Sequence, residues 1–207
     1  MSGQIETRDG TSEAHRFASV VRFVALLNLI YFVIEFWVAV TIGSVSLLAD
    51  SVDFLEDAAV NFLIFAALGW TLARRAQTGM ALAAFLLVPA TAFLWTLWRK
   101  FAEPVVPLPL PLAATGLGAL AINLVCAFAL ARFRHHAGSL SKAAFLSARN
   151  DAIANVGIIT AGLATLVSPT IWPDLVVGLG IAAMNVGAAG EVWRAALKEH
   201  AKIGSRS

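Results

Sequence analysis

The chain has 207 residues, of which 59% are hydrophobic and 14% charged, and its mean hydropathy is +0.78. Soluble domains are about half apolar and a quarter charged, so this composition excludes an ordinary soluble domain and indicates an integral membrane protein. The net charge is +2, but the basic residues are scattered at the ends of apolar segments, which argues against nucleic-acid binding. The single cysteine, Cys126, lies in an apolar run and predicts a buried side chain rather than a disulfide.

Six segments are apolar around most of their helical circumference and long enough to cross a bilayer. Crossing about 30 Å of hydrocarbon takes roughly 20 helical residues, because a helix rises about 1.5 Å per residue. The segments cover residues 18–42, 46–72, 78–98, 112–132, 143–167 and 172–196. The pattern predicts an all-α integral membrane protein with six transmembrane helices.

Charge and proline patterns predict how these helices are arranged. Lysine and arginine are concentrated on the side of the two termini, and the other side has only Arg99 and Lys100, so the positive-inside rule predicts cytoplasmic termini. The connection EPVVPLPLPL, residues 103–112, predicts an extended external loop that ends both neighbouring helices. We expect a multi-pass protein of a bacterial-type inner (plasma) membrane.

The chain ends predict little folded structure outside the membrane. Residues 1–16 are polar and lack the pattern of a cleaved signal peptide, and residues 198–207 are too few for a folded domain. The expected organisation is a flexible cytoplasmic tail over 1–16, one six-helix membrane domain over 17–197, and a short cytoplasmic tail over 198–207 without a C-terminal domain.

The second apolar segment contains four carboxylates in the stretch LLADSVDFLED. Ionised groups inside a membrane are unfavourable unless they are paired, neutralised or hydrated, so their presence favours a functional site. Asp53 and Asp57 are four residues apart and share one helix face, with Asp50 one turn before and Asn61 one turn after. This face is a polar stripe.

Two carboxylates of this segment have alternative interpretations. Asp50 belongs to the stripe, caps the helix in contact with water, or pairs with an arginine. Glu56 assists the site, faces another helix, or forms a salt bridge with Arg149.

The fifth segment repeats the arrangement, because FLSARNDAIANVG places Ser147, Asp151 and Asn155 four residues apart. Two helices therefore offer oxygen-bearing side chains that can converge. Convergent carboxylates repel one another unless a divalent cation or protons neutralise them. Since metal ligands must lose their protons to bind, such a site would exchange metal for protons, which suits an antiporter.

The remaining polar residues favour structural roles. Interhelical hydrogen bonding is the favoured interpretation for polar residues of the other segments, which are Asn28, Tyr31, Glu35, Asn123 and Asn185. The adjacent His135 and His136 lie in a basic loop and are expected to be solvated.

These residues resemble the cation diffusion facilitators, six-helix exporters of divalent transition metals. The resemblance covers about residues 18–197 and is strongest in IYFVIEFWVAVTIGSVSLLADSVDFLED, SARNDAIANVGIITAGL and WPDLVVGLGIAAM. The family's metal site uses a His-or-Asp, three residues, Asp motif on helix 2 and a similar motif on helix 5, which fall here on Asp53 with Asp57 and on Ser147 with Asp151. The resemblance implies that the three aspartates are ligands of a tetrahedral site and that transport is by alternating access, driven by protons.

Ser147 departs from the family pattern, because histidine or aspartate usually stands at that position. The resemblance leaves Ser147 as a weak ligand, a hydrogen-bond partner or a place for water, and Glu56, Asn150 or Asn155 could supply a missing ligand. An all-oxygen set leans toward Mn(II) or Fe(II), because zinc favours nitrogen and sulfur ligands. The prevalence of zinc in the family keeps Zn(II) as the first choice, followed by Cd(II) and Co(II).

The second departure is the expected absence of a cytoplasmic domain, so a homodimer would have to form through membrane helices. No resident cofactor is expected, and the partners are metal ions, protons and lipid. Alternative functions are a membrane-embedded metalloenzyme and a non-transporting metal sensor or partner subunit. An enzyme fits less well, because every histidine lies in a tail or loop.

Overall fold

The computed structural model describes the backbone of residues 3–67, 71, 74, 90–131 and 138–185, and the side chains of 15–66, 71, 74, 90–131 and 150–185. Four long helices are α1 (Gly3–Ile42), α2 (Val45–Ala67), α4 (Pro109–Ala131) and α5 (Gly138–Val167). Residues 90–102 and 172–185 are also helical. All regular secondary structure in the described residues is helical, which confirms the all-α prediction.

Three of the described helical segments are long and apolar enough to cross a membrane, namely His15–Ile42, Pro109–Ala131 and Asn150–Val167. They coincide with the predicted segments 18–42, 112–132 and 143–167. Helix α2 has a comparable length of 23 residues, but its four carboxylates distinguish it from the other three.

Some predicted features lie outside the described residues. They are the first part of segment 78–98, the second part of segment 172–196, the loop with His135 and His136, and the tail 198–207.

Two predicted boundaries differ from the structure. Helix α1 already begins at Gly3, so residues 3–16 extend the first helix instead of forming the flexible tail that we predicted. Once a helix is nucleated, each further residue adds a backbone hydrogen bond at little cost. The external loop is also shorter than predicted: residues 104–108 have no regular structure, and Pro109 and Pro111 lie in the first turn of α4, where proline is tolerated.

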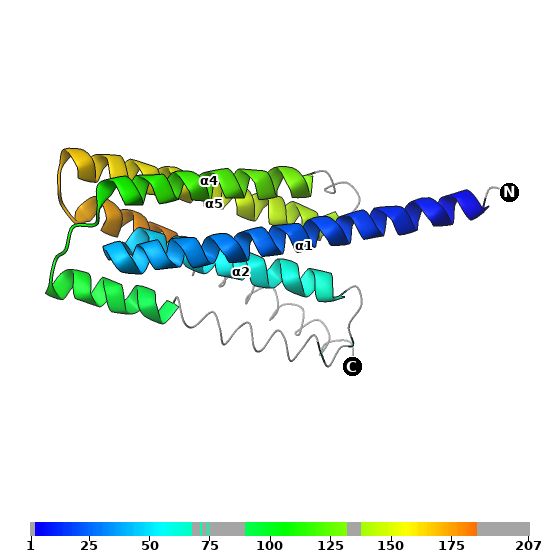
Figure 1. The fold of residues 1–207 in the computed structure, drawn as a ribbon, viewed down its shortest axis with the longest axis horizontal. Helices are drawn as coiled ribbons and strands as arrows, with labels where there is room; N and C mark the ends of the chain where they lie inside the picture. Colours follow the sequence, from blue (N-terminus) through cyan, green and yellow to red (C-terminus); the bar gives the residue numbers. More distant parts are fainter. Residues whose placement is uncertain (1–2, 68–70, 72–73, 75–89, 132–137, 186–207) are drawn as a thin grey trace, which may run out of the picture.

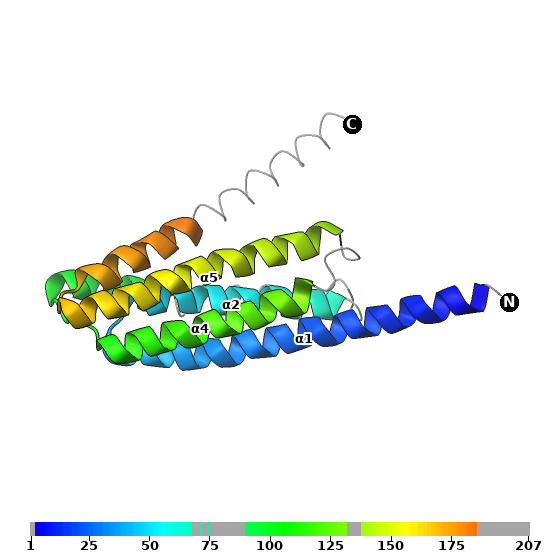
Figure 2. The same cartoon turned by 90° about the horizontal axis from the view of Figure 1, so that it is seen from above.

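The helices form a bundle in which α1 packs along α2, α4 packs along α5, and α1 also contacts α4 (Figures 1 and 2). The connections at residues 43–44, 103–108 and 168–171 all lie at one end of the bundle, opposite the N-terminus (Figure 1). The largest buried apolar cluster joins α1, α2, α4, α5 and the helix 172–185 near that end; its members include Leu47, Leu48, Leu112, Ile158 and Ile181. Cys126 is buried and unbridged, as predicted.

A two-residue turn fixes the angle between α1 and α2. Gly43 has a positive φ of 65°, and the Ser44 N–H donates to the Ala39 carbonyl at 2.9 Å, which is the bond that closes a helix C-terminus after a left-handed glycine. The Ser44 hydroxyl then accepts from the Leu47 N–H at 3.2 Å and caps α2. The tight turn therefore sets the register between α1 and α2.

A buried cluster of Ser44, Ser46, Lys100 and Asp174, which we call the Asp174 cluster, ties three helices together at this end. The Asp174 carboxylate accepts from the Ser44 and Ser46 hydroxyls at 2.6 and 2.7 Å and from the Val45 and Ser46 N–H groups at 2.9 and 3.1 Å. It thus binds the positive end of the α2 dipole.

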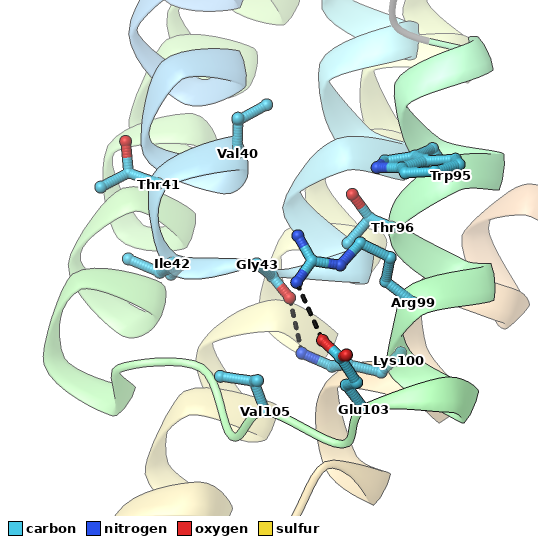
Figure 3. A pocket seen from close by; sticks show the side chains of 10 residues that line it. All are labelled: Val40, Thr41, Ile42, Gly43, Trp95, Thr96, Arg99, Lys100, Glu103 and Val105. Atoms are coloured by element: carbon cyan, nitrogen blue, oxygen red, sulfur yellow. Dashed lines mark hydrogen bonds and ion pairs between the residues drawn. The ribbon is translucent and has the colours of Figure 1, made fainter.

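Lys100 completes the cluster from the helix 90–102. Its Nζ lies 3.4 Å from Asp174 Oδ2. The same Nζ donates to the Gly43 carbonyl at 2.5 Å (Figure 3). Beside it is a cavity of about 300 Å³. The exposed Arg99–Glu103 ion pair forms part of the lining of this cavity (Figure 3). This end of the molecule is fastened by polar contacts, whereas the carboxylates of α2 lie further along the bundle.

Candidate metal centre

The polar stripe of α2 faces into the bundle. Asp53 and Asp57 are partly buried, while Phe54 and Leu55 between them pack into an apolar cluster with α1 and α4. Asn61 is buried, and its Nδ2 donates to the Asp57 carbonyl at 2.8 Å, which holds its amide against its own helix. The stripe therefore runs along the inner face of α2, as the four-residue spacing predicted.

Helix α5 carries the matching arrangement. Asp151 is partly buried, and Asn155 is fully buried with its Nδ2 donating to the Asp151 carbonyl at 2.8 Å, as Asn61 does on α2. The Asn155 Oδ1 has no hydrogen-bond partner. Asn150 is exposed. Ser147 lies one turn before Asp151 on α5, but its side chain is outside the described ones.

The carboxylates of α2 and α5 lie close enough for their charges to interact. Asp53 interacts electrostatically with Asp151, and Asp151 also interacts with Asp57. These are residues of two helices that are nearly one hundred positions apart in the chain. The two helices therefore bring acidic side chains within range of one another's charge, and their convergence on one ion stays a prediction.

Asn185 joins this group from a third helix. Its Nδ2 donates to Asp53 Oδ1 at 2.5 Å, across 132 residues of sequence. The sequence indicated an interhelical hydrogen bond for Asn185 and did not indicate that its partner is a candidate ligand. An amide that donates to Asp53 stabilises the ionised carboxylate, which is the form that binds a metal.

The carboxylates are near one another without forming a closed cage. Within the described residues, no three side chains of histidine, cysteine, aspartate or glutamate are close enough together to hold a metal ion. The arrangement in this conformation is a set of like charges that face one another across two helices. Such a set attracts a divalent cation or protons, because either one would remove the repulsion.

The structure also separates the alternatives for Asp50 and Glu56. Asp50 is completely buried and has no hydrogen-bond partner, so the solvated cap is wrong; the cap of α2 comes from Ser44 and Asp174 instead. Glu56 is exposed, although its charge reaches Asp53 and Asp151. The side chain of Arg149 lies outside the described ones.

The described structure is a helical bundle with three apolar spans and acidic side chains between its helices, which is typical of a multi-span membrane protein. A family model described as the cation efflux transmembrane domain matches residues 21–199. The chain therefore belongs to the cation efflux family, the cation diffusion facilitators, whose members are integral membrane transporters of divalent metal ions. A comparison with curated proteins found no match to this chain.

Proposed function

We propose that this protein exports a divalent transition-metal ion in exchange for protons by alternating access, with Asp53, Asp57, Ser147 and Asp151 as the ion site. The observation that carries the proposal is that Asp53 of α2 and Asp151 of α5 lie close enough for their charges to interact. No cationic side chain is among the charged neighbours that act on Asp53 or Asp151 in the described part of the chain. The carboxylates would therefore bind a divalent metal ion and protons alternately, and either one would neutralise their negative charge.

The proposed topology is six transmembrane helices in one domain over residues 17–197, with both termini in the cytoplasm. Large apolar side chains on the outer surface of the described helices support lipid contact, for example Trp37, Phe128 and Val156. The same apolar surface supports a homodimer through membrane helices, and we propose a bacterial-type inner membrane as its location.

Zn(II) is the proposed ion, followed by Cd(II) and Co(II). Three carboxylates and a hydroxyl form an all-oxygen set that is also suited to Mn(II) or Fe(II). Asn155 supports the set from α5, because its unpartnered Oδ1 is a buried oxygen one turn from Asp151.

Flux measurement tests the proposal directly. Purified protein in sealed proteoliposomes is expected to move at least one of Zn, Cd, Co, Mn and Fe, with protons moving in the opposite direction, as recorded by an internal pH dye. Metal flux without proton movement would contradict antiport. No flux of any ion through folded protein would instead favour a sensor, a partner subunit or an enzyme.

Ser147→His is expected to shift ion preference toward zinc and cadmium. An imidazole at this position adds a nitrogen ligand, which suits these ions better than manganese. We expect the ratio of zinc to manganese affinity to rise by about tenfold or more, which corresponds to about 1.4 kcal/mol. Titration calorimetry of both ions in detergent measures it, and Ser147→Ala is the matched control. An unchanged ratio would place Ser147 away from the ion.

A further inference from the structure

A second acidic pair lies between α1 and α2, apart from the proposed ion ligands. Glu35 and Asp50 each have 0% exposure, and none of their four carboxylate oxygens accepts a hydrogen bond from a described donor. Their side chains are nevertheless within hydrogen-bonding reach of each other. Two ionised carboxylates cannot bond to each other, because both are acceptors only, so the contact becomes a hydrogen bond only when one of them carries a proton.

Among the described residues, the charged neighbours of the pair are all acidic and none of them neutralises it. Asp53 acts on Glu35 and Asp57 acts on Asp50, both from α2, and Asp50 also acts on Asp151 of α5. All of these neighbours are acidic. The cations that the structure describes lie elsewhere, because Lys100 binds Asp174, Arg99 pairs with Glu103, and the others are exposed; these others are Arg16, Arg22 and Arg74.

The described neutral donors of α1 and of the helix 172–185 donate to other groups. The Tyr31 hydroxyl, one turn before Glu35, donates to the Thr115 carbonyl of α4 at 2.6 Å. The Asn28 Nδ2 donates to the Val24 carbonyl at 3.0 Å and lies 3.8 Å from the Cys126 sulfur. From the helix 172–185, Asn185 donates to Asp53. Two fully buried acids that have no donor or cation among the described side chains are the arrangement in which two carboxyl groups share one proton.

We propose that Glu35 and Asp50 form a proton-binding site in the interior of the bundle, in which the two carboxyl groups share one proton and the pair carries a single negative charge. A metal ion is a poorer occupant, because a metal needs four or more ligands, and no described group of three acidic, histidine or cysteine side chains is close enough to hold one. A proton needs only the two oxygens that face each other.

The first test is infrared difference spectroscopy of the full chain in detergent at neutral pH. The C=O stretch of a protonated carboxylic acid is expected to be weaker by about one group per chain in Glu35→Gln and in Asp50→Asn, because an amide replaces the acid and donates to the remaining carboxylate. Glu103→Gln is the control and should leave the band unchanged, because the Glu103 side chain is 72% exposed and pairs with Arg99 outside this acidic group. An unchanged band in both Glu35→Gln and Asp50→Asn would overturn the proposal.

The double variant Glu35→Gln with Asp50→Asn covers the case in which a single variant fails to fold. Its two amides can bond to each other, and it is expected to lose the same band. Circular dichroism and elution as a single species establish that it is folded. A folded double variant with the native band would overturn the proposal equally.

A consequence that rests on the proposed function is that metal binding would release this proton. An ion among Asp53, Asp57 and Asp151 brings two positive charges near the pair, so the protonated carboxyl loses its proton to water and the pair becomes doubly ionised. Adding zinc to weakly buffered protein is therefore expected to release about one proton fewer per chain in Glu35→Gln than in the native protein, at similar zinc affinity. Equal release would contradict this coupling. Absence of zinc binding by the native protein would contradict the proposed function, while the infrared test of the pair would stand.

Discussion

Asp151→Ala is expected to abolish metal flux into proteoliposomes while leaving the helices folded. Asp151 is the α5 carboxylate whose charge interacts with Asp57 and Asp53 of α2, so its removal takes away the proposed ligand from α5. We expect the ion affinity to fall by at least about 100-fold, since even residues behind the ligands contribute 10- to 100-fold. Asp57→Ala should have the same effect from the other helix.

The fold should survive this change for an electrostatic reason. The described charged neighbours of Asp151 are acidic, so the alanine removes a repulsive group from a partly buried position. Ile153→Ala is the matched control, because Ile153 lies two residues away on α5, is 61% exposed and faces outward. Ile153→Ala should retain flux, and near-normal flux in Asp151→Ala would show that the ion site lies elsewhere.

The four-residue spacings predicted which side chains share a face of one helix, and this succeeded for Asp53 with Asp57 and for Asp151 with Asn155. Spacing of this kind is a property of a single helix and needs no knowledge of its neighbours. Hydropathy likewise located α1, α4 and α5, because the length of an apolar run is set by the thickness of the membrane.

Contacts between helices were not predictable in the same way. Asn185 meets Asp53, and Glu35 meets Asp50, only because the register and rotation of packed helices bring them together. That register depends on many apolar contacts and on the turn at Gly43, and none of these is visible in the local pattern. The sequence indicates an interhelical hydrogen bond for Glu35, but it does not indicate that the neighbouring group on α2 is a second acid.

Asp174 illustrates the same limit. In the sequence it follows Trp172 and Pro173, and no local pattern indicates which groups it contacts. The structure adds the N-terminus of a different helix, α2, and the ammonium of Lys100. Only the packed bundle shows that Asp174, at the start of the helix 172–185, binds both the N-terminus of α2 and the Lys100 ammonium.

Asp174→Ala is expected to lower the free energy of unfolding by about 3–5 kcal/mol, which is the typical effect of removing one partner of a buried ion pair. Asp174 is 0% exposed and accepts four hydrogen bonds from Ser44, Val45 and Ser46. The alanine leaves those donors unsatisfied, and it leaves the buried Lys100 with only the Gly43 carbonyl as partner. Unfolding in detergent, followed by circular dichroism during a denaturant titration, measures the change.

Two further variants separate the buried charge from the lost cap. Lys100→Met combined with Asp174→Ala removes the uncompensated ammonium, so the double variant should be more stable than Asp174→Ala alone, although the α2 donors stay unsatisfied. Glu103→Ala breaks the neighbouring ion pair with Arg99, whose side chains are 58% and 72% exposed, and should change stability by no more than about 1 kcal/mol. If Asp174→Ala cost no more than Glu103→Ala, the Asp174 cluster would not fasten this end of the bundle, and the register of α2 would depend on the apolar core and the Gly43 turn alone.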